Sequence, residues 1–275
     1  MDIKIIATDL DGTLLAPDHV SVTPRTMAAL TNAHEKGVKI AISTGRTLSL
    51  IKEVREKIPF ADYIIYSNGA AVYDCKKDQT VYEQTVPDKK TQKIIQILEN
   101  FSAYYNIYSD GNIYIKKTSD TGVFEKTDLP REFLMHFLET AILKDDMISE
   151  MQRRKAEQII VYFASDECRN AIYKAVNDLG GLHTVSSFSN NIEIMSDAAS
   201  KGLAVKAICD ILGCTAENAM TFGDAWNDCS MLEFAEHSFA MANGDEKSKL
   251  SAKNICPSNA DDGVAQMIEK YILNA

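Results

Sequence analysis

The chain has 275 residues, 45% of them hydrophobic, with a formal net charge of -10 and a pI near 5.0. This acidic balance argues against binding along a nucleic-acid backbone, although a bound divalent cation would still admit small anionic substrates. The chain start lacks signal-peptide features, and no run reaches the roughly 20 apolar residues that span a bilayer. The six scattered cysteines favour reduced thiols over disulfides or a zinc site. We therefore expect a cytoplasmic protein that binds neither nucleic acid nor membrane.

The first third of the chain alternates strand-like and helical segments. Residues 3–7 predict a short buried strand, and a helix is predicted to begin at Pro24 and to end before Gly37. Two more strands are predicted over 38–42 and 63–66. Alternation at this spacing implies right-handed crossovers and a parallel sheet.

The pattern changes in the middle of the chain, where predicted helices near 89–101, 133–142 and 167–179 mix with predicted strands over 104–108, 113–115, 158–164, 183–188 and 192–195. The turn Ser109-Asp110-Gly111-Asn112 predicts a hairpin, because Asp-Gly accommodates a positive φ. The tyrosines of this hairpin, Tyr104, Tyr105, Tyr108 and Tyr114, favour packing on the sheet faces over a platform for stacking a substrate. Hairpins mixed with helices suggest an inserted α+β unit.

Alternation resumes at Ser200, with a helix over 201–212, strands over 219–222 and 239–241, and a closing helix over 264–273. We predict an α/β fold with a Rossmann-like parallel-sheet core. This core would consist of residues 1–82 and 189–275, interrupted by an α+β cap domain over 83–188.

Two acidic residues, Asp9 and Asp11, directly follow the first predicted strand and precede Gly12-Thr13. Ligands of parallel sheets bind beyond the carboxyl ends of the strands. Two carboxylates this close repel each other unless a cation lies between them, and Mg²⁺ is held by few carboxylates. A carboxylate can also attack phosphorus and form an aspartyl-phosphate. The alternative is an ordinary solvated turn.

Three other segments place polar groups at strand ends or helix starts. Gly223-Asp224-Ala225-Trp226-Asn227-Asp228 adds two carboxylates and an amide, and Ser43-Thr44-Gly45-Arg46 adds a hydroxyl, a backbone N–H and a guanidinium. Lys201 adds an ammonium group at a helix start. Each segment alone also suits a turn or a helix cap. Together they supply the groups needed for metal-assisted phosphoryl transfer.

In their order along the chain, Asp9-Leu10-Asp11-Gly12-Thr13, Ser43-Thr44-Gly45-Arg46, Lys201 and Gly223-Asp224-x-x-Asn227-Asp228 resemble the motifs of the haloacid dehalogenase superfamily of phosphatases. The large insertion resembles the C2-type cap of its Cof-type branch. The ending Asp262-Gly263-Val264-Ala265 is similar to that group, and the resemblance covers essentially the whole chain. Two departures are Ala225-Trp226 inside the last motif and Ser196-Asp197-Ala198-Ala199-Ser200 before the lysine.

The resemblance implies a role for each matched residue. Asp9 would be the nucleophile and a Mg²⁺ ligand, and Asp11 the general acid/base, whose backbone carbonyl also contacts the metal. Asp224 and Asp228 would complete the metal site. The phosphoryl group would be held by Leu10, Thr44, Gly45, Lys201 and Asn227, and the substrate side would include Arg46, Asn68 and Gly69.

We therefore expect Mg²⁺-dependent hydrolysis of a small phosphorylated metabolite, such as a sugar phosphate or a phosphorylated cofactor. The enzyme would be a monomer or a weak homodimer. One alternative is a sugar phosphomutase of the same superfamily, which would pass the phosphoryl group to a sugar hydroxyl. Another is a non-catalytic phosphometabolite-binding protein, which would require a broken catalytic set, whereas every position is filled here.

Overall fold

The computed structural model describes residues 2–119, 131–162, 166–185 and 191–274, and the chain divides into two compact units. The first, called the core unit here, comprises residues 1–45, 52–82 and 200–275. The second, called the insert unit, comprises residues 46–51 and 83–199. Within the described ranges, none of the helices combines the length and the apolar character needed to cross a membrane.

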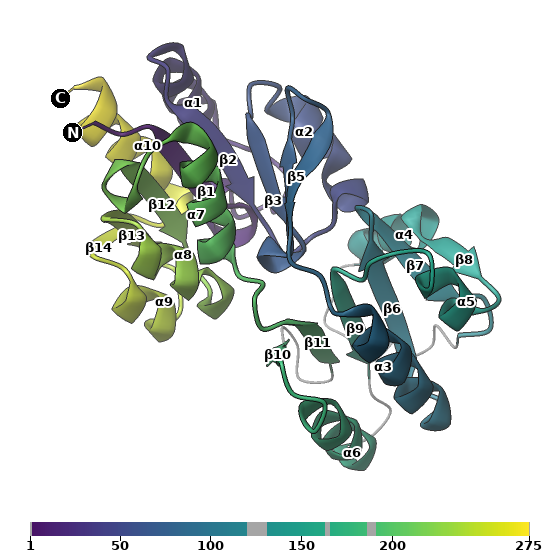
Figure 1. The fold of residues 1–275 in the computed structure, drawn as a ribbon. Helices are drawn as coiled ribbons and strands as arrows, with labels where there is room; N and C mark the ends of the chain where they lie inside the picture. The colour runs from purple at the N-terminus through teal and green to yellow at the C-terminus, as the bar shows by residue number, and fades with distance from the viewer. Residues whose placement is uncertain (1, 120–130, 163–165, 186–190, 275) are drawn as a thin grey trace. The chain divides into compact units, whose positions relative to one another are not determined.

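An eight-stranded sheet forms the centre of the core unit, in the order β14-β13-β12-β1-β2-β3-β4-β5 (Figure 1). The strands are β1 (Ile5–Asp9), β2 (Lys39–Ser43), β3 (Tyr63–Tyr66), β4 (Ala71–Asp74), β5 (Gln79–Glu83), β12 (Ala219–Gly223), β13 (His237–Met241) and β14 (Asn254–Cys256). All neighbours from β14 to β3 are parallel, whereas β4 runs antiparallel to β3. The predicted parallel-sheet core is confirmed.

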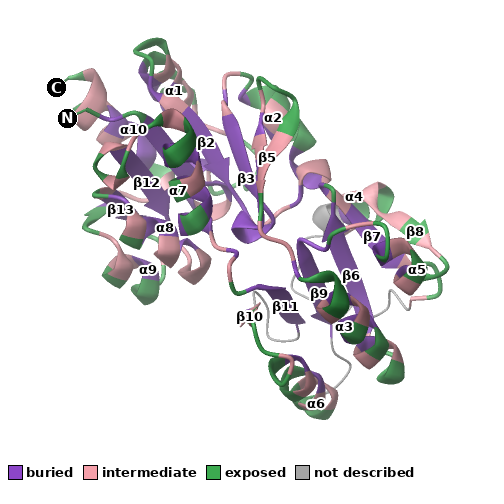
Figure 2. Cartoon of the chain, in the orientation of Figure 1, coloured by how far each residue is buried: buried purple, intermediate pink, exposed green. Residues whose placement is uncertain are grey.

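The helices of the core unit are α1 (Pro24–Glu35), α2 (Lys52–Lys57), α7 (Lys201–Leu212), α8 (Cys229–Phe234), α9 (Glu246–Ser251) and α10 (Gly263–Ile268). Short helical turns cover Leu10–Leu14, Ser67–Gly69, Ala216–Asn218, Trp226–Asp228, Asn259–Asp261 and Glu269–Leu273. Helices α7 and α8 pack on the sheet face that carries Ile5 and Ala7. Because helices cover this sheet, its central strands are buried along their whole length, as Figure 2 shows for β1 and β12.

Local sequence explains how the two longest core helices begin. Thr23 caps α1 by accepting a hydrogen bond from the backbone N–H of Thr26, and Pro24 follows at the first helical position. Ser200 caps α7 in the same way, accepting from the N–H of Leu203. This cap fixes the point at which α7 begins and therefore the place of its first residue, Lys201.

A six-stranded sheet forms the centre of the insert unit, in the order β10-β11-β9-β6-β7-β8. Its strands are β6 (Tyr104–Ser109), β7 (Asn112–Lys116), β8 (Ile142–Lys144), β9 (Gln158–Tyr162), β10 (Leu182–Val185) and β11 (Asn191–Ser196). Its helices are α3 (Asp88–Asn100), α4 (Arg131–Thr140), α5 (Met147–Met151) and α6 (Asp166–Asn177), and a single turn covers Leu48–Ile51. The hairpin predicted around Asp110-Gly111 is confirmed by the pairing of β6 with β7.

Alternate residues of the insert sheet pack on its two faces. Tyr105 and Tyr114 join the apolar cluster that contains residues of α3, α5 and α6. Tyr104 and Tyr108 join a second cluster that contains Phe137 of α4. The predicted packing of these tyrosines on the sheet faces is therefore confirmed.

Some sequence-based boundaries are wrong, and residues 46–51, predicted to belong to the core, group with the insert unit. The inserted unit does not end at residue 188, because β11 pairs with β9 and β10 and buries Ile192 and Ile194 in their shared apolar cluster. The helix predicted to reach Ile142 ends at Thr140, since Ile142 begins a strand that pairs with β7. Residues 163–164 and 186–188 of two other predicted strands lie outside the described residues.

Candidate active site

The four segments that carry the predicted motif residues lie at the carboxyl ends of neighbouring core strands or at the start of a core helix. Strand β1 ends at Asp9, β2 ends just before Thr44, and β12 ends just before Asp224. Strands β12, β1 and β2 are adjacent and parallel, so these ends meet at one edge of the sheet. Lys201, the first residue of α7, reaches this edge through its side chain.

A buried lysine links two of the aspartates. Lys201 Nζ donates to Asp9 Oδ1 over 2.5 Å and to Asp228 Oδ1 over 2.6 Å. The side chains of Lys201 and Asp228 are 0% exposed. Burial alone would lower the pKa of Lys201, but its two carboxylate partners raise it above the ordinary value. The ammonium group is therefore charged and holds both carboxylates in fixed orientations.

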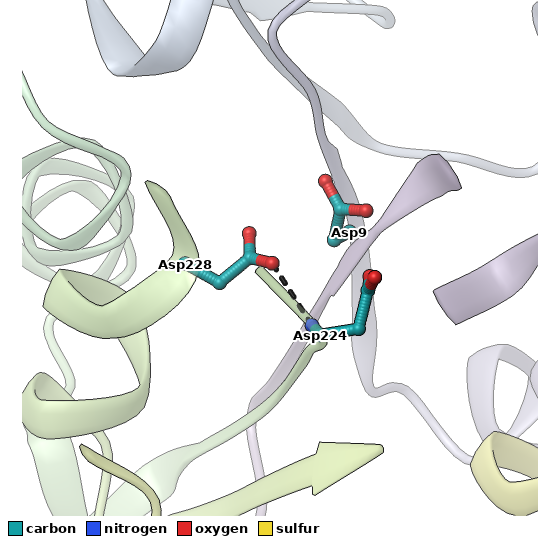
Figure 3. A group of neighbouring side chains, drawn as sticks. All are labelled: Asp9, Asp224 and Asp228. Atoms are coloured by element: carbon teal, nitrogen blue, oxygen red, sulfur yellow. Dashed lines mark hydrogen bonds between the residues drawn. The ribbon is translucent and has the colours of Figure 1, made fainter. Parts of the chain in front are cut away.

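Asp228 also shapes the loop in which it lies. Its Oδ2 accepts hydrogen bonds of 3.0 Å from the backbone N–H groups of Asp224 and Ala225, and Figure 3 shows the first of these. Both carboxylate oxygens of Asp228 therefore have protein partners, one with Lys201 and one with the loop. Asp228 therefore links α7 to the loop after β12.

The loops after β1 and β12 interlock at Asp224. Thr13 Oγ1 donates to Asp224 Oδ1 over 2.7 Å. Gly12 has a φ of 83°, and a Cβ atom at this position would lie 2.4 Å from Asp224 Oδ2. Glycine is required here for both reasons, because a side chain would strain the backbone and displace the carboxylate. Asp224 is therefore placed by the residues that follow Asp9.

Three carboxylates converge in this site, as Figure 3 shows for Asp9, Asp224 and Asp228. One oxygen from each lies within 4.8 Å of the others. Burial, and then repulsion from Asp228, raise the pKa of Asp9 well above its ordinary value, while Lys201 opposes the shift. Burial is also the main cause that raises the pKa of Asp224 to about 6, against the hydrogen bond from Thr13.

This donor set fits a hard divalent cation. Its oxygens are all carboxylate oxygens, which Mg²⁺ prefers, and a cation among them would offset the repulsion that adds to burial in raising both pKa values. Asp11 also lies near the group, since its charge contributes to the raised pKa of Asp9 and of Asp224. Its side chain is not one of the three that converge.

Only some of the residues predicted to hold a phosphoryl group contact one another in the structure. Thr44 is buried, and its backbone carbonyl accepts a 3.1 Å hydrogen bond from the N–H of Asn68. Asn227 Nδ2 donates to Asn68 Oδ1 over 3.0 Å, and Gly45 lies beside the same Asn68 amide. Leu10 is buried in the loop after Asp9. The loops after β1, β2, β3 and β12 thus supply these positions within the core unit.

Two of the predicted substrate-side residues also lie in the core unit, but the third does not. Asn68 and Gly69 form the turn after β3. Arg46 belongs to the insert unit, where its charge acts on the hydroxyl of Tyr108. A place for Arg46 beside the substrate stays a prediction.

The loop after β13 was not among the predicted site segments, although it donates hydrogen bonds to the backbone of Gly12 and Asp224. Asn243 Nδ2 donates to the carbonyl of Gly12 over 2.8 Å. The N–H of Asp245 and the hydroxyl of Ser248 both donate to the carbonyl of Asp224, over 2.8 Å and 2.9 Å. The sequence does indicate this loop as part of the site, because Asn243-Gly244-Asp245 follows a predicted strand whose carboxyl end belongs to the same sheet edge.

Comparison with known proteins agrees with this geometry. A 5-amino-6-(5-phospho-D-ribitylamino)uracil phosphatase of Bacillus subtilis is 26% identical over 275 residues, covering 99% of this chain and 97% of the relative. A pyridoxal phosphate phosphatase of Escherichia coli is 28% identical over 277 residues, covering 99% of this chain and 100% of the relative. The solved structure of a haloacid dehalogenase-like hydrolase from B. subtilis has a TM-score of 0.82 at 27% identity, covering 98% of this chain and 100% of that one.

The family assignment follows from nearly the whole length of the chain. The model of the haloacid dehalogenase-like hydrolases matches residues 6–268, which include every motif residue from Asp9 to Asp228. The family predicted from the four motifs is thereby confirmed. This chain is an enzyme of the haloacid dehalogenase-like hydrolase family.

Proposed function

We propose that this enzyme hydrolyses phosphate monoesters of small metabolites, with Asp9 as the nucleophile and Mg²⁺ as the cofactor. The observation that carries this proposal is the buried group at the end of β1. There Asp9 is held by Lys201, and the carboxylates of Asp224 and Asp228 approach it within 4.8 Å. A nucleophilic carboxylate, a fixed ammonium and a hard-cation donor set in one place are the requirements of phosphoryl transfer through an aspartyl-phosphate.

The first step is attack by Asp9 on phosphorus. Lys201 binds Oδ1 of Asp9, which orients the carboxylate and favours its ionised form despite burial. The bond from phosphorus to the ester oxygen breaks as the bond to Asp9 forms. In the second step, water attacks the phosphorus, releases inorganic phosphate and regenerates the Asp9 carboxylate.

Asp11 is the residue that we propose for proton transfer. It lies two residues beyond Asp9 and is only half-buried, and its charge acts on both Asp9 and Asp224. It would give a proton to the leaving oxygen in the first step and take one from water in the second. This is the same role that the motif resemblance implies.

The remaining polar groups would hold the phosphoryl oxygens. Candidate donors are the Thr44 hydroxyl, the Asn227 amide, the Lys201 ammonium and the backbone N–H groups of Leu10 and Gly45. Asp9, Asp224 and the backbone carbonyl of Asp11 would hold Mg²⁺, with Asp228 in support. When bound, the metal would neutralise charge on the phosphoryl oxygens and on the carboxylates.

The relatives support the proposed substrate class. Two phosphatases that match this chain almost end to end act, by name, on pyridoxal phosphate and on a phosphorylated ribitylaminouracil. Both are small phosphorylated metabolites. We propose a substrate of this kind, either a sugar phosphate or a phosphorylated cofactor.

Replacement of the nucleophile tests this function. Asp9→Asn should lower Mg²⁺-dependent hydrolysis of an aryl phosphate by at least about a thousandfold, because the neutral amide does not attack phosphorus. The fold should persist, since the change removes one charge from a group of mutually repelling carboxylates. Circular dichroism checks the fold, and Asp210→Asn serves as a matched control, because Asp210 is exposed and pairs only with Lys206 among the described ion pairs. Near-normal hydrolysis by Asp9→Asn would contradict the proposal.

A further inference from the structure

The turn that follows β3 has an unusual backbone. Ser67, Asn68 and Gly69 have successive φ values of 49°, 55° and 89°. Left-handed conformations are disfavoured for residues other than glycine, so two of these positions are held there by their surroundings. All three residues are buried, and the Asn68 N–H donates to the Thr44 carbonyl over 3.1 Å. The turn is therefore fixed against the loop that follows β2.

The Asn68 side chain connects two loops of the active site. Its Oδ1 accepts a 3.0 Å hydrogen bond from Nδ2 of Asn227, in the loop after β12. A Cβ atom placed on Gly45, in the loop after β2, would lie 3.0 Å from the same Oδ1. Asn68 thus lies between two positions that we propose to bind the phosphoryl group, and all of them belong to the core unit.

This contact determines which way the Asn227 amide faces. An amide group donates only through its nitrogen, which carries two hydrogens. One N–H of Asn227 is bonded to Asn68, so the other is left for a phosphoryl oxygen. With the Asn227 amide rotated by half a turn and the Asn68 amide kept in place, the oxygens of Asn227 and Asn68 would face each other and repel. Asn68 therefore selects the orientation in which Asn227 is a donor.

The same turn also meets the helix that carries Lys201. A Cβ atom on Gly69 would lie 2.2 Å from the carbonyl carbon of Ser200 and 2.5 Å from the backbone nitrogen of Lys201. Only a glycine permits this approach, because any side chain would push the start of α7 away. One turn thus contacts both the amide and the lysine of the site.

We propose that Asn68 is a positioning residue, which acts on the phosphoryl group through Asn227 and does not touch the substrate. This inference rests on the proposed phosphatase function. It replaces the substrate contact implied by the motif resemblance with a role inside the core unit. Because Asn227 would bind the phosphoryl group both in the substrate and in the transition state, loss of its orientation should weaken binding more than turnover.

Asn68→Gly removes the amide but keeps the backbone, since glycine adopts a φ of 55° without strain. The variant, loaded with Mg²⁺, should show a KM and an inhibition constant for inorganic phosphate raised about two- to tenfold, the effect of one lost hydrogen bond. Its kcat should change less. Unchanged values of both constants would overturn the proposal.

A double-mutant cycle separates positioning from direct contact. In an Asn227→Ala background, Asn68→Gly should cause no further change in KM or in the phosphate inhibition constant, because the amide that it orients is gone. If the two effects multiply, Asn68 acts on the substrate or on the fold independently of Asn227, and the proposal fails.

The cycle also separates this inference from the proposed function. If the wild-type enzyme turns over no phosphate ester with Mg²⁺, the proposed function fails. Calorimetric titration of inorganic phosphate into the same four proteins then decides the positioning role. Coupled losses of phosphate affinity would support it, whereas independent losses, or no phosphate binding by the wild type, would overturn it.

Discussion

The core unit and the insert unit bury polar groups in different ways. In the core unit, Lys201, Asp9, Asp228, Asp224 and Thr13 form one connected set of ion pairs and hydrogen bonds. In the insert unit, the sheet face with Tyr104 and Tyr108 also carries Asn106, by strand alternation. The amide of Asn106 is fully buried, and neither of its polar atoms has a hydrogen-bond partner among the described residues.

This difference predicts which amino-acid substitutions each unit tolerates. A buried charge is stable only with a specific partner at a specific distance, so each member of the core network depends on the others. The apolar clusters of the insert sheet accept any apolar side chain of suitable volume, although this sheet also buries Glu193, which accepts hydrogen bonds from Gln158 and Asn191. We therefore expect loss of the shared cation, Lys201, to affect stability and activity together, and volume-conserving apolar substitutions in the insert sheet to have small effects on stability.

The largest expected effect comes from removing the buried cation. Lys201→Met should lower the free energy of unfolding of the metal-free protein by about 3–5 kcal/mol, because Asp9 and Asp228 lose their common partner inside the protein. Urea unfolding measures the change. Lys155→Met is the matched control from the insert unit, where the exposed pair with Glu83 is screened by solvent and should contribute little. Equal losses of unfolding free energy in the two variants would contradict the proposed difference between the units.

Mg²⁺ should stabilise the core unit selectively. At a concentration about 100 times the dissociation constant, bound Mg²⁺ should raise the free energy of unfolding by about 2.7 kcal/mol. Bound Mg²⁺ should slow the hydrogen exchange of backbone amides in the loops after β1 and β12, and should leave the exchange rates in β9 of the insert unit unchanged. Asp224→Asn should abolish the effect, because it removes one of the three converging carboxylates. Protection that rises equally in β9 would contradict a metal site confined to the core.

The close approach at Gly69 predicts a somewhat smaller loss. Gly69→Ala should destabilise the protein by about 2–3 kcal/mol, because it adds overlap with Ser200 to the strain of a positive φ. Gly213→Ala is a matched control at the other end of α7. Gly213 also has a positive φ, but a Cβ atom there would meet nothing within 4 Å, so only the backbone strain of about 1 kcal/mol applies. Thermal unfolding compares them, and only Gly69→Ala should also reduce phosphatase activity.

The smallest effect is expected in the insert sheet. Asn106→Leu keeps the branched shape of the side chain and removes two buried polar atoms that have no partner among the described residues. We expect the free energy of unfolding to stay the same or to rise by up to about 1 kcal/mol. Chemical denaturation measures it. A loss of stability would mean that this amide has a partner such as a buried water, and the contrast with the core network would weaken.

The same contrast explains what the sequence could predict. The helix start at Lys201 was predicted, and the strands that end at Asp9, Ser43 and Gly223 were predicted to end one or two residues earlier, because polar residues follow short apolar runs. Their convergence also followed, since parallel strands place their carboxyl ends at one edge. The motif order then identified the family from only a few residues.

The structural features that the sequence did not predict depend on which segments meet in the tertiary structure. Strand β11 belongs to the insert sheet because Ile192 and Ile194 pack with β9, and nothing in its own sequence distinguishes this partner from the core sheet. The loop after β13 was visible as a predicted strand end, but the individual hydrogen bonds from Ser248 and Asp245 to the carbonyl of Asp224 were not. The contact of Asn68 with Asn227 likewise depends on where two loops meet.

The central claim, that Asp9 carries the phosphoryl group, is tested most directly by trapping the intermediate. The enzyme would be mixed with Mg²⁺ and a phosphate ester, quenched with acid during turnover, and treated with borohydride, which reduces an acyl phosphate to an alcohol. Peptide mass spectrometry should then find homoserine in place of Asp9, with Asp11 unchanged and no such product without substrate. Homoserine at another aspartate, or an unmodified Asp9 in an enzyme that releases the alcohol product in a burst, would contradict the account.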